Sequence, residues 1–527
     1  MARLWDVSPT LPAPWWPAQK VEATNIASNV RTVAKTNDSG DYILPFLIPG
    51  DYEVTLEMAG FERLARRATI EMSATVTVNA TLVVGSASET VKVVAQADPM
   101  DVSSGSAGYV VDSQSITELP NKDGNVALLA MLSPGVMNTI PSGWSRPFDV
   151  SANLSPGVQG VAQGSNQYSL DGSPNMASNY NSYVPPPGVV EELKVQTATF
   201  DASYGFTPGA TINMSLKSGT NALHGQAYDF LQNPLLNANS FFSNKAGQPR
   251  GVFRLNRWGI NANGPVEIPK LYNGKNKTFW MYGYEGIHST DPRGNLSTAV
   301  PTAAENNGDF SADLNIGKQY QIYDPATIRA TSGGHTTCSP FPGNIIPTSR
   351  INPTARNIAN FYSAPNTLGA ADDSDNYFTT GPEWDHYYNH IFRIDHNFSE
   401  KNRMFVRGDV TGRDQNFGYL FNGADGDNLL QHNRGAAIDD VYIISPQFLL
   451  NTRYSYTRFL YFQHPLQLGM DLTALGFSPQ FVQQAEAQGP LGYRLPIINI
   501  SGYAALSVSQ GSAVNPTSSI TIRTIWE

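Results

Sequence analysis

Apolar and polar positions alternate one by one along many segments of this chain, and such alternation predicts half-buried β-strands. Two N-terminal segments show it: Asp51–Glu57, with Tyr52, Val54 and Leu56 on one face, and Thr75–Leu82, with Val76, Val78, Ala80 and Leu82 inward. Asp38-Ser39-Gly40 and Pro49-Gly50 supply turns. Residues 18–84 are therefore predicted to form a small β-sandwich, and residues 1–17 an irregular N-terminus.

From about residue 223 onward, longer segments set an apolar or aromatic face against a face of Arg, Asn and Asp. The clearest examples oppose Trp258, Ile260 and Ala262 to Gly259, Asn261 and Asn263; Tyr388, His390, Phe392 and Ile394 to Asn389, Ile391, Arg393 and Asp395; and Leu450, Thr452, Tyr454 and Tyr456 to Asn451, Arg453, Ser455 and Thr457. A barrel in lipid around a wet lumen requires these two faces, and its strands must close because lipid cannot pair with backbone groups. A soluble sandwich predicts the same alternation with a less polar second face, so the consecutive inward Arg and Asn favour residues 223–527 as a barrel.

The connections between these strands alternate in length. Residues 399–402 and 445–447 form tight turns, whereas residues 287–386 form a long stretch rich in Pro, Gly, Asn and Asp. A loop of that length argues against a compact soluble domain. Short periplasmic turns and long external loops are what an outer-membrane barrel uses.

Residues 101–222 combine helical and strand patterns. Asn125–Leu132 predicts a short helix that Ser133-Pro134-Gly135 ends, and Tyr168–Asn175 predicts a strand that enters an Asp171-Gly172 turn. Ala210–Lys217 alternates without a break, and the glycines around it suit tight backbone bends. An α+β domain with a glycine-rich loop is the general prediction for this region.

Two family resemblances give these patterns a function. Thr36–Glu62 (TNDSGDYILPFLIPGDYEVTLEMAGFE) resembles the carboxypeptidase regulatory-like domain, a transthyretin-like sandwich, although its usual opening strands are absent or degenerate before Val21. Pro185–Asn221 (PPPGVVEELKVQTATFDASYGFTPGATINMSLKSGTN) and the Asp171-Gly172 turn resemble the plug domain of TonB-dependent outer-membrane receptors. The plug motif comprises Asp171, Gly172, Tyr204, Gly205, Gly209, Asn213, Lys217, Ser218, Gly219, Thr220 and Asn221.

Further segments are similar to the Oar-like branch of that family: NKTFWMYGYEG (276–286), VPTAAENNGDFS (300–311) and PFPGNIIPTSRINPTA (340–355). The resemblance implies a plugged barrel of twenty-two strands that takes up an external ligand, with energy supplied by TonB. The implied fold is mostly β: a transthyretin-like β-sandwich, an α+β plug domain and an incomplete antiparallel transmembrane β-barrel. The implied place is the outer membrane of Gram-negative type.

The linker, residues 85–100, contains one short strand-like run. Its residues are Glu89, Thr90, Val91, Lys92, Val93, Val94 and Ala95. In TonB-dependent receptors a similar segment, the TonB box, pairs strand to strand with TonB in the periplasm, which is β-augmentation. A plain interdomain strand is the alternative, and the position directly before a plug-like domain favours the box.

The barrel region is short for this family. Beyond residue 222 and without the long loop, about 205 residues remain, whereas twenty-two strands of roughly 10 residues need about 220. The N-terminus lacks the charged and apolar regions of a signal peptide, and the chain ends at Ile525-Trp526-Glu527 without a terminal aromatic residue. We therefore expect a fragment, with sequence missing at both ends.

Composition and the absence of known motifs exclude several classes of function. The net charge of −10 and the lack of a long basic run argue against nucleic acid as a partner. The single cysteine, Cys338, cannot form an intramolecular disulfide, and no run of 18 apolar residues predicts a spanning helix. None of the eight histidines begins an HxxE or HExxH motif, and GxSxG and GxxxxGK[ST] are absent. We expect no enzyme, catalytic residue, metal site or cofactor.

The expected partners are a TonB-type energy-coupling protein, outer-membrane lipid and an unknown extracellular ligand such as a glycan, peptide or chelate. The alternative is a surface-exposed or secreted carbohydrate-binding or adhesion β-protein without transport. Acidic segments Asp372-Asp373-Ser374-Asp375 and Asp425-Gly426-Asp427 offer oxygen ligands for Ca²⁺ but lack EF-hand spacing, so solvated external loops are the favoured interpretation.

Overall fold

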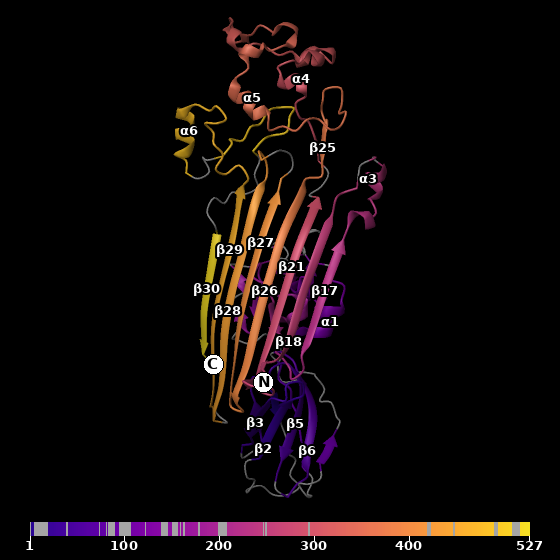
Figure 1. The fold of residues 1–527 in the computed structure, drawn as a ribbon, viewed down its shortest axis with the longest axis vertical. Helices are drawn as coiled ribbons and strands as arrows, with labels where there is room; N and C mark the ends of the chain where they lie inside the picture. Colours follow the sequence, from indigo (N-terminus) through magenta and orange to yellow (C-terminus); the bar gives the residue numbers. More distant parts are fainter. Residues whose placement is uncertain are drawn as a thin grey trace.

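The computed structural model is mostly β, as predicted, and contains a sandwich, an inner α+β domain and a large antiparallel sheet (Figure 1). It describes residues 2–4, 19–37, 40–58, 60–72, 74–80, 82, 90–93, 107–121, 123–138, 146–149, 156–158, 160–161, 164–177, 180–198, 208–245, 247, 250–292, 296–418, 423–445, 448–489, 494–507 and 517–526. We call the large sheet the outer sheet, because the inner domain packs against one of its faces.

The sandwich is built on a five-stranded sheet in the order β3-β2-β5-β6-β7. Its strands are β2 (Lys20–Asn25), β3 (Arg31–Lys35), β5 (Gly50–Glu57), β6 (Arg63–Ile70) and β7 (Thr90–Val93). β7 pairs with β6 in parallel, and the other neighbours are antiparallel. The predicted alternation places Tyr52, Val54 and Leu56 in the sandwich core, where burial of apolar area stabilises the fold.

Two details of the sandwich differ from prediction. The expected irregular N-terminus contributes a strand, β1 (Ala2–Leu4), which pairs antiparallel with β4 (Tyr42–Leu44). The segment Thr75–Leu82 has the expected buried positions Val76, Val78 and Ala80, but its described residues form no ladder strand. The edge of β6 that β5 leaves free pairs with β7.

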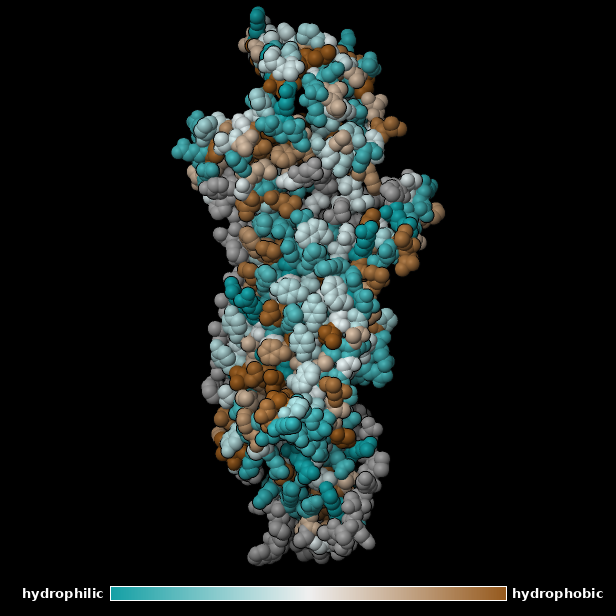
Figure 2. All heavy atoms as spheres, in the orientation of Figure 1, coloured by the Kyte–Doolittle hydropathy of each residue, from teal (hydrophilic) through white to brown (hydrophobic). Residues whose placement is uncertain are grey.

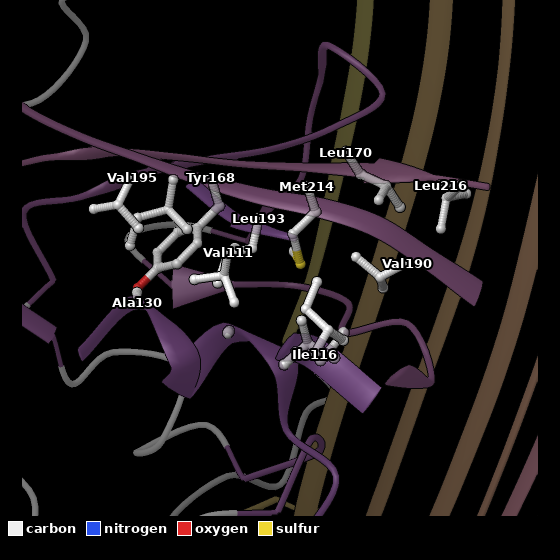
Figure 3. Packing of buried hydrophobic residues seen from close by; sticks show 14 of the residues in the cluster. Val111, Ile116, Ala130, Tyr168, Leu170, Val190, Leu193, Val195, Met214 and Leu216 are labelled. Carbon is white, nitrogen blue, oxygen red and sulfur yellow. The ribbon is translucent and has the colours of Figure 1, made fainter. Parts of the chain in front are cut away.

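The inner domain centres on a mixed sheet in the order β12-β11-β16-β15-β8. Its strands are β8 (Ala107–Asp112), β11 (Gln167–Leu170), β12 (Ser173–Pro174), β15 (Val190–Ala198) and β16 (Thr211–Leu216). Helix α1 (Ser113–Glu118) and the 3-10 helix η1 (Val126–Leu132) cover one face and close a core around Tyr168, Leu193 and Met214 (Figure 3). The helix predicted at 125–132 is thus a 3-10 helix, with the Asn125 side chain capping its start.

Short elements complete the inner domain. They are β9 (Val136–Asn138) paired with β10 (Pro156–Val158), β13 (Met176–Ala177) paired with β14 (Tyr180–Asn181), and the 3-10 helix η2 (Pro187–Val189).

The outer sheet has eight strands, each antiparallel to the next in chain order. They are β17 (His224–Gln232), β18 (Arg254–Pro265), β21 (Thr278–Pro292), β26 (Pro382–Ser399), β27 (Asn402–Phe417), β28 (Asp427–Ser445), β29 (Phe448–Pro465) and β30 (Thr517–Trp526). Within the described residues β17 and β30 pair on one side only, so the sheet is open.

The two faces of the outer sheet separate as the sequence pattern predicts. On β26 the outward Tyr388, Phe392 and Ile394 are 41%, 47% and 45% exposed, whereas the inward Asn389 and Arg393 are 0% and 5% exposed. Figure 2 shows hydrophobic side chains in separate patches among pale and hydrophilic ones along the molecule, and hydrophilic side chains gathered toward the end that holds the sandwich. Among the described residues no helix is long and apolar enough to cross a membrane.

The loop expected at 287–386 is shorter at both ends, because β21 and β26 continue to pair up to Pro292 and Pro382. It carries β22 (Leu296–Thr298), α4 (Ala303–Asn306), η4 (Ser311–Asn315), η5 (Lys318–Tyr320), η6 (Pro325–Thr327), β23 (Arg329–Ala330), β24 (Thr336–Thr337), η7 (Pro342–Asn344), η8 (Thr348–Arg350), α5 (Pro353–Ala359) and β25 (Tyr377–Thr379). A small core of Val300, Tyr362, Leu495 and Leu506 joins it to the segment after β29, which carries α6 (Pro479–Glu486).

Four further short elements lie near the first strands of the outer sheet. They are η3 (Pro234–Leu236), α3 (Phe241–Lys245), and the paired β19 (Glu267–Ile268) and β20 (Tyr272–Asn273).

A substitution at Leu193 tests how far the stability of the inner domain depends on its apolar core. The side chain is fully buried, so Leu193→Ala leaves a cavity and is expected to destabilise the inner domain by about 2–5 kcal/mol. Amide hydrogen exchange of β15 and β16 in the full chain measures the effect. Leu193→Met, which keeps the volume, should cost less than about 1.5 kcal/mol. Equal protection in Leu193→Ala and the native chain would contradict this account.

Candidate functional site

The most densely charged contact in the described residues lies where the inner domain meets the outer sheet. Its centre is the predicted Asp171-Gly172 turn, which joins β11 to β12 with Leu170 paired directly to Ser173. Both turn residues have positive φ, +49° and +72°, as a two-residue hairpin of this kind requires. A Cβ on Gly172 would lie 2.4 Å from Nη1 of Arg453, so glycine also allows the outer sheet to approach.

Three arginines from three strands of the outer sheet hold this turn. Arg393 on β26 donates from Nη1 to Asp171 Oδ1 at 2.9 Å, and Arg453 on β29 donates from Nη1 to the Gly172 carbonyl at 3.0 Å. Arg407 on β27 donates to the Leu170 carbonyl at 3.3 Å and places Nε 3.4 Å from Asp171 Oδ2. We call this contact, Asp171-Gly172 with Arg393, Arg407 and Arg453, the latch.

Carboxylates of the outer sheet itself balance each latch arginine. Arg393 pairs with Asp395 at 2.7 Å, Arg407 with Asp409 at 3.2 Å, and Arg453 with Asp439 at 2.5 Å. Residues two apart on a strand share a face, which places the first two pairs side by side. Buried charges are tolerated only when they are paired and hydrogen-bonded, so the latch depends on all of these carboxylates.

The Asp171–Arg407 contact is the least complete part of the latch. Asp171 Oδ2 and Arg407 Nε are both buried, and neither has a hydrogen-bond partner in the described structure. At 3.4 Å the two atoms attract each other as charges without good hydrogen-bond geometry. Asp171 Oδ1, in contrast, accepts from both Arg393 and the Leu216 amide. The turn is therefore held by two hydrogen bonds to Asp171 Oδ1 and only by charge attraction at Asp171 Oδ2.

A second charged cluster lies further along the same interface. Arg146 and Asp149 of the inner domain meet Asp385 of β26 and Arg413 of β27, with Arg146 Nη1 3.1 Å and Arg413 Nε 2.6 Å from the Asp385 carboxylate. All four side chains are at most 8% exposed. The Phe148 ring lies beneath both guanidinium groups, 5.1 and 4.3 Å from their centres. Glu383 of β26 also lies 3.9 Å from Arg146 Nη2, so two cations face three anions in this buried contact.

The other predicted plug-motif residues fall at separate places. Asn213 on β16 lies beside the latch and accepts a hydrogen bond from Ser169. The Gly209 amide donates to the Ser165 carbonyl at 2.8 Å, and a Cβ there would collide with that oxygen. In the contacts described, the Ser218 hydroxyl donates to the Gly219 carbonyl, and the Thr220 hydroxyl donates to the Ala222 carbonyl and accepts from the Ala222 amide. Tyr204 and Gly205 lie outside the described residues.

The last residues of the plug motif connect the inner domain to both the sandwich and the outer sheet. A Cβ on Gly219 would lie 2.6 Å from the Gly264 carbonyl of β18, so only glycine fits here without a shift. The backbone N–H of Asn221 donates to the Ala27 carbonyl of the sandwich at 3.1 Å. Its Oδ1 accepts from the Asn276 amide, next to β21, at 2.8 Å. Asn221 therefore ties the sandwich and the outer sheet to the end of the inner domain.

A second contact holds the sandwich to the inner domain. Glu192 on β15 accepts from the Met72 amide at 2.7 Å, and Lys194 on the same face donates to the Met72 carbonyl at 2.9 Å. Burial raises the pKa of the Glu192 carboxyl to about 7, with repulsion from Glu71 and Glu191 adding to it and the Met72 hydrogen bond opposing it. Burial lowers the pKa of the Lys217 ammonium, which lies near Glu191.

A cavity of about 330 Å³ lies at the junction of the three parts. Its wall includes Pro49 and Met72 of the sandwich, Asp171 of the inner domain, and Arg393 and Arg403 of the outer sheet. The latch therefore borders a space that opens beside the sandwich.

The box-like segment is described only in part. Thr90, Val91, Lys92 and Val93 form β7, whereas Glu89, Val94 and Ala95 lie outside the described residues. The segment is thus not a separate linker strand, because its backbone pairs with β6 of the sandwich.

The two acidic segments lie in different surroundings. Asp373 places a carboxylate oxygen within 4.8 Å of oxygens from Glu305 and Asp313; all three residues are half-buried, and acidic groups of this kind are common without an ion. Asp425 and Asp427 are 6% and 1% exposed, which corrects the expectation of a solvated loop. Asp427 begins β28 on the inward face and accepts from Gln463 at 3.1 Å.

The sequence pattern assigned Arg393, Asp395 and Arg453 to the inward face but did not connect them to Asp171. Arg407, Arg413 and the Arg146–Asp149 pair were not identified. A usable signal existed, since Arg393-x-Asp395 and Arg407-x-Asp409 repeat the same two-residue spacing on neighbouring strands.

Asp171→Asn should weaken the latch. The change leaves Arg393 and Arg407 facing a neutral amide in a buried site, and we expect the inner domain to lose about 3 kcal/mol of stability against local opening. Hydrogen exchange at the Leu216 amide measures this loss. The matched control is Asp324→Asn, which removes the exposed ion pair with Arg350 and should have no measurable effect. An effect of the same size in both variants would refute the role of the latch.

The contact between sandwich and inner domain should weaken as the pH rises. Because the folded pKa of Glu192 is about 7 and its ordinary value is 4.5, the contact is strongest below about 4.5 and loses stability as the pH rises through 7. Hydrogen exchange at the Met72 amide between pH 5 and 8, corrected for the intrinsic rate, measures it. Glu192→Gln should remove this dependence, and an unchanged pH profile in that variant would contradict the assignment.

Two families match the chain. The outer membrane beta barrel domain matches residues 215–524, more than half of the chain, and the carboxypeptidase regulatory-like domain matches residues 16–83. The chain is 27% identical over 226 residues to the TonB-dependent transporter Oar of Myxococcus xanthus, covering 40% of this chain and 20% of that protein. It therefore spans about a fifth of the length of this relative.

Solved structures with a similar arrangement include the outer membrane transporter YddB from Escherichia coli and the siderophore receptor PirA from Acinetobacter baumannii. The first has a TM-score of 0.43 at 11% identity, over 68% of this chain and 40% of that one. The second has a TM-score of 0.36 at 12% identity, over 79% of this chain and 44% of that one.

The family matches agree with the inward and outward faces of the outer sheet and with the sandwich before it. The matched domain is one of the outer membrane. The chain belongs to the outer membrane β-barrel domain family, and its N-terminal residues match the carboxypeptidase regulatory-like domain.

Proposed function

We propose that the chain is part of a receptor for energy-coupled uptake across the outer membrane, with the inner domain as its plug. The observation that carries this proposal is the latch, in which one turn of the inner domain is held by arginines from three strands of the outer sheet. A plug must be fixed at rest and separable on demand. Charged contacts suit that task, because water can solvate both sides once they part.

The name of the Myxococcus relative, a TonB-dependent transporter, supports the same role. In this proposal residues Glu89–Ala95 are the TonB box, and a TonB-type protein pairs with them by β-augmentation. The next described strand after this segment is β8, which is the end strand of the inner sheet and pairs only with β15 in the described structure. If the segment leaves β6, a pull on it acts first on this edge strand, which separates a few hydrogen bonds at a time.

The ligand is proposed to bind on the opposite side, over the long loops. Residues 296–381, 466–489 and 494–507 share the small core around Tyr362 and Leu506, so these parts of the loops form one joint surface. A glycan, a peptide or a chelate, too large or too scarce for free diffusion, is the proposed class of cargo. Outer-membrane lipid is the proposed surrounding of the outward face, with its exposed aromatic and apolar residues.

Cross-linking in cells tests the coupling step. In a Cys338→Ser background, Val91→Cys is expected to form a cross-link with a cysteine in the periplasmic domain of the TonB-type protein. Tyr109→Cys on β8 is the matched control, exposed but outside the box, and should not cross-link. Proline at Val91 should abolish coupling, because it removes a backbone donor from the strand.

Absence of the Val91 cross-link in cells that contain the TonB-type protein would overturn the proposal. It would favour the alternative, a surface-exposed binding or adhesion protein, which needs no energy-coupling partner.

A further inference from the structure

The backbone of β7 is part of the sandwich sheet. Thr90–Val93 pairs in parallel with Arg63–Arg66, with Thr90 opposite Arg63 and Val93 opposite Arg66. On its other side β6 pairs with β5 along Leu64–Ile70. In the described residues β7 is the end of the sheet, so its second edge faces no other strand.

We propose that the sandwich presents β7 as an edge strand, to which the TonB-type partner adds its own sheet without displacing β7 from β6. The sandwich is then a docking platform, and the sheet of the receptor continues into the sheet of its partner. This inference rests on the proposed function, since it takes the segment at 89–95 as the TonB box.

The geometry of a strand permits both pairings at once. Successive residues direct their backbone N–H and C=O groups to opposite edges, so the groups that bond β6 differ from those available to a second strand. A partner strand therefore does not have to compete with β6. Replacement of β6 by the partner would break one set of hydrogen bonds to make another, with little net gain.

Docking on β6 also prepares the segment for binding. A free linker must be ordered residue by residue when it joins a sheet, which opposes association. β7 is already extended and in register. In the part of the chain that the structure describes, β7 is only four residues long. Short edges limit pairing with unrelated chains, so the arrangement favours a partner that also contacts the sandwich.

A disulfide that holds β7 on β6 tests whether the partner can bind β7 in this position or only after β7 has left β6. Arg63→Cys and Thr90→Cys, opposite each other in the register, are introduced together into the full chain with Cys338→Ser. Arg63→Cys with Lys92→Cys is the control for register, since Lys92 lies opposite Ala65 and the pair is too far apart to form a bond. The probe is the purified periplasmic domain of the TonB-type protein, and its Kd is measured with the disulfide oxidised and reduced.

We expect the oxidised chain to bind as tightly as the reduced chain, or roughly two- to tenfold more tightly because the strand is pre-ordered. Binding by the reduced chain with a loss of more than tenfold on oxidation would overturn the inference and leave the proposed function intact.

A peptide of residues 85–100 distinguishes the remaining outcomes. If the peptide binds the probe and neither state of the chain does, the edge of β7 is not available and the inference is wrong, whereas the box assignment stands. If neither the peptide nor the chain binds, the box assignment fails and the inference fails with it.

Discussion

The structure depends on the neutralisation of charge between the inner domain and the inward face of the outer sheet. Arg393, Arg407 and Arg413 are at most 5% exposed and the Arg453 side chain is 16% exposed. An unpaired guanidinium in such surroundings would be strongly destabilising. Each arginine has a carboxylate from its own sheet, and Asp149 and Asp171 of the inner domain supply the rest. The inner domain is consequently part of what makes the inward face stable. Without the inner domain, water would have to solvate the charged side chains of the inward face.

The same constraint explains which features the sequence could predict. A period of two along each strand separates the inward polar residues from the outward Tyr388, Phe392 and Ile394, so the fold class follows from local alternation. The Asp171-Gly172 turn is equally local. The partners of Asp171 are not, because Arg393 lies 222 residues away and reaches it only through the register of β26 against the inner domain. The spacing along a strand predicts which face of the sheet an arginine lies on, but it does not predict which carboxylate pairs with that arginine.

The errors near the N-terminus arise from sheet edges. Val76, Val78 and Ala80 have the alternation of a strand and the burial of one, yet the edge of β6 belongs to Thr90–Val93. Ala2–Leu4 likewise becomes a strand because β4 offers it an edge. Several segments with strand-like patterns compete for each free edge, and tertiary contacts decide the outcome. Single-sequence patterns therefore predict the buried residues of the sandwich better than they predict its ladder.

The contacts form a short route from the sandwich to the latch. The backbone of Met72 is held on both sides by Glu192 and Lys194 of β15, and Glu192 lies opposite Ser215 of β16. The next residue, Leu216, donates its amide to Asp171. If β7 stays on β6 while a partner pulls, force enters the sandwich and reaches the latch through two adjacent strands. A released β7 would instead load β8 alone. If the sandwich presents β7, the pull therefore acts on β15, an inner strand next to β16, which bonds Asp171. A small displacement there lengthens the already incomplete contact between Asp171 and Arg407.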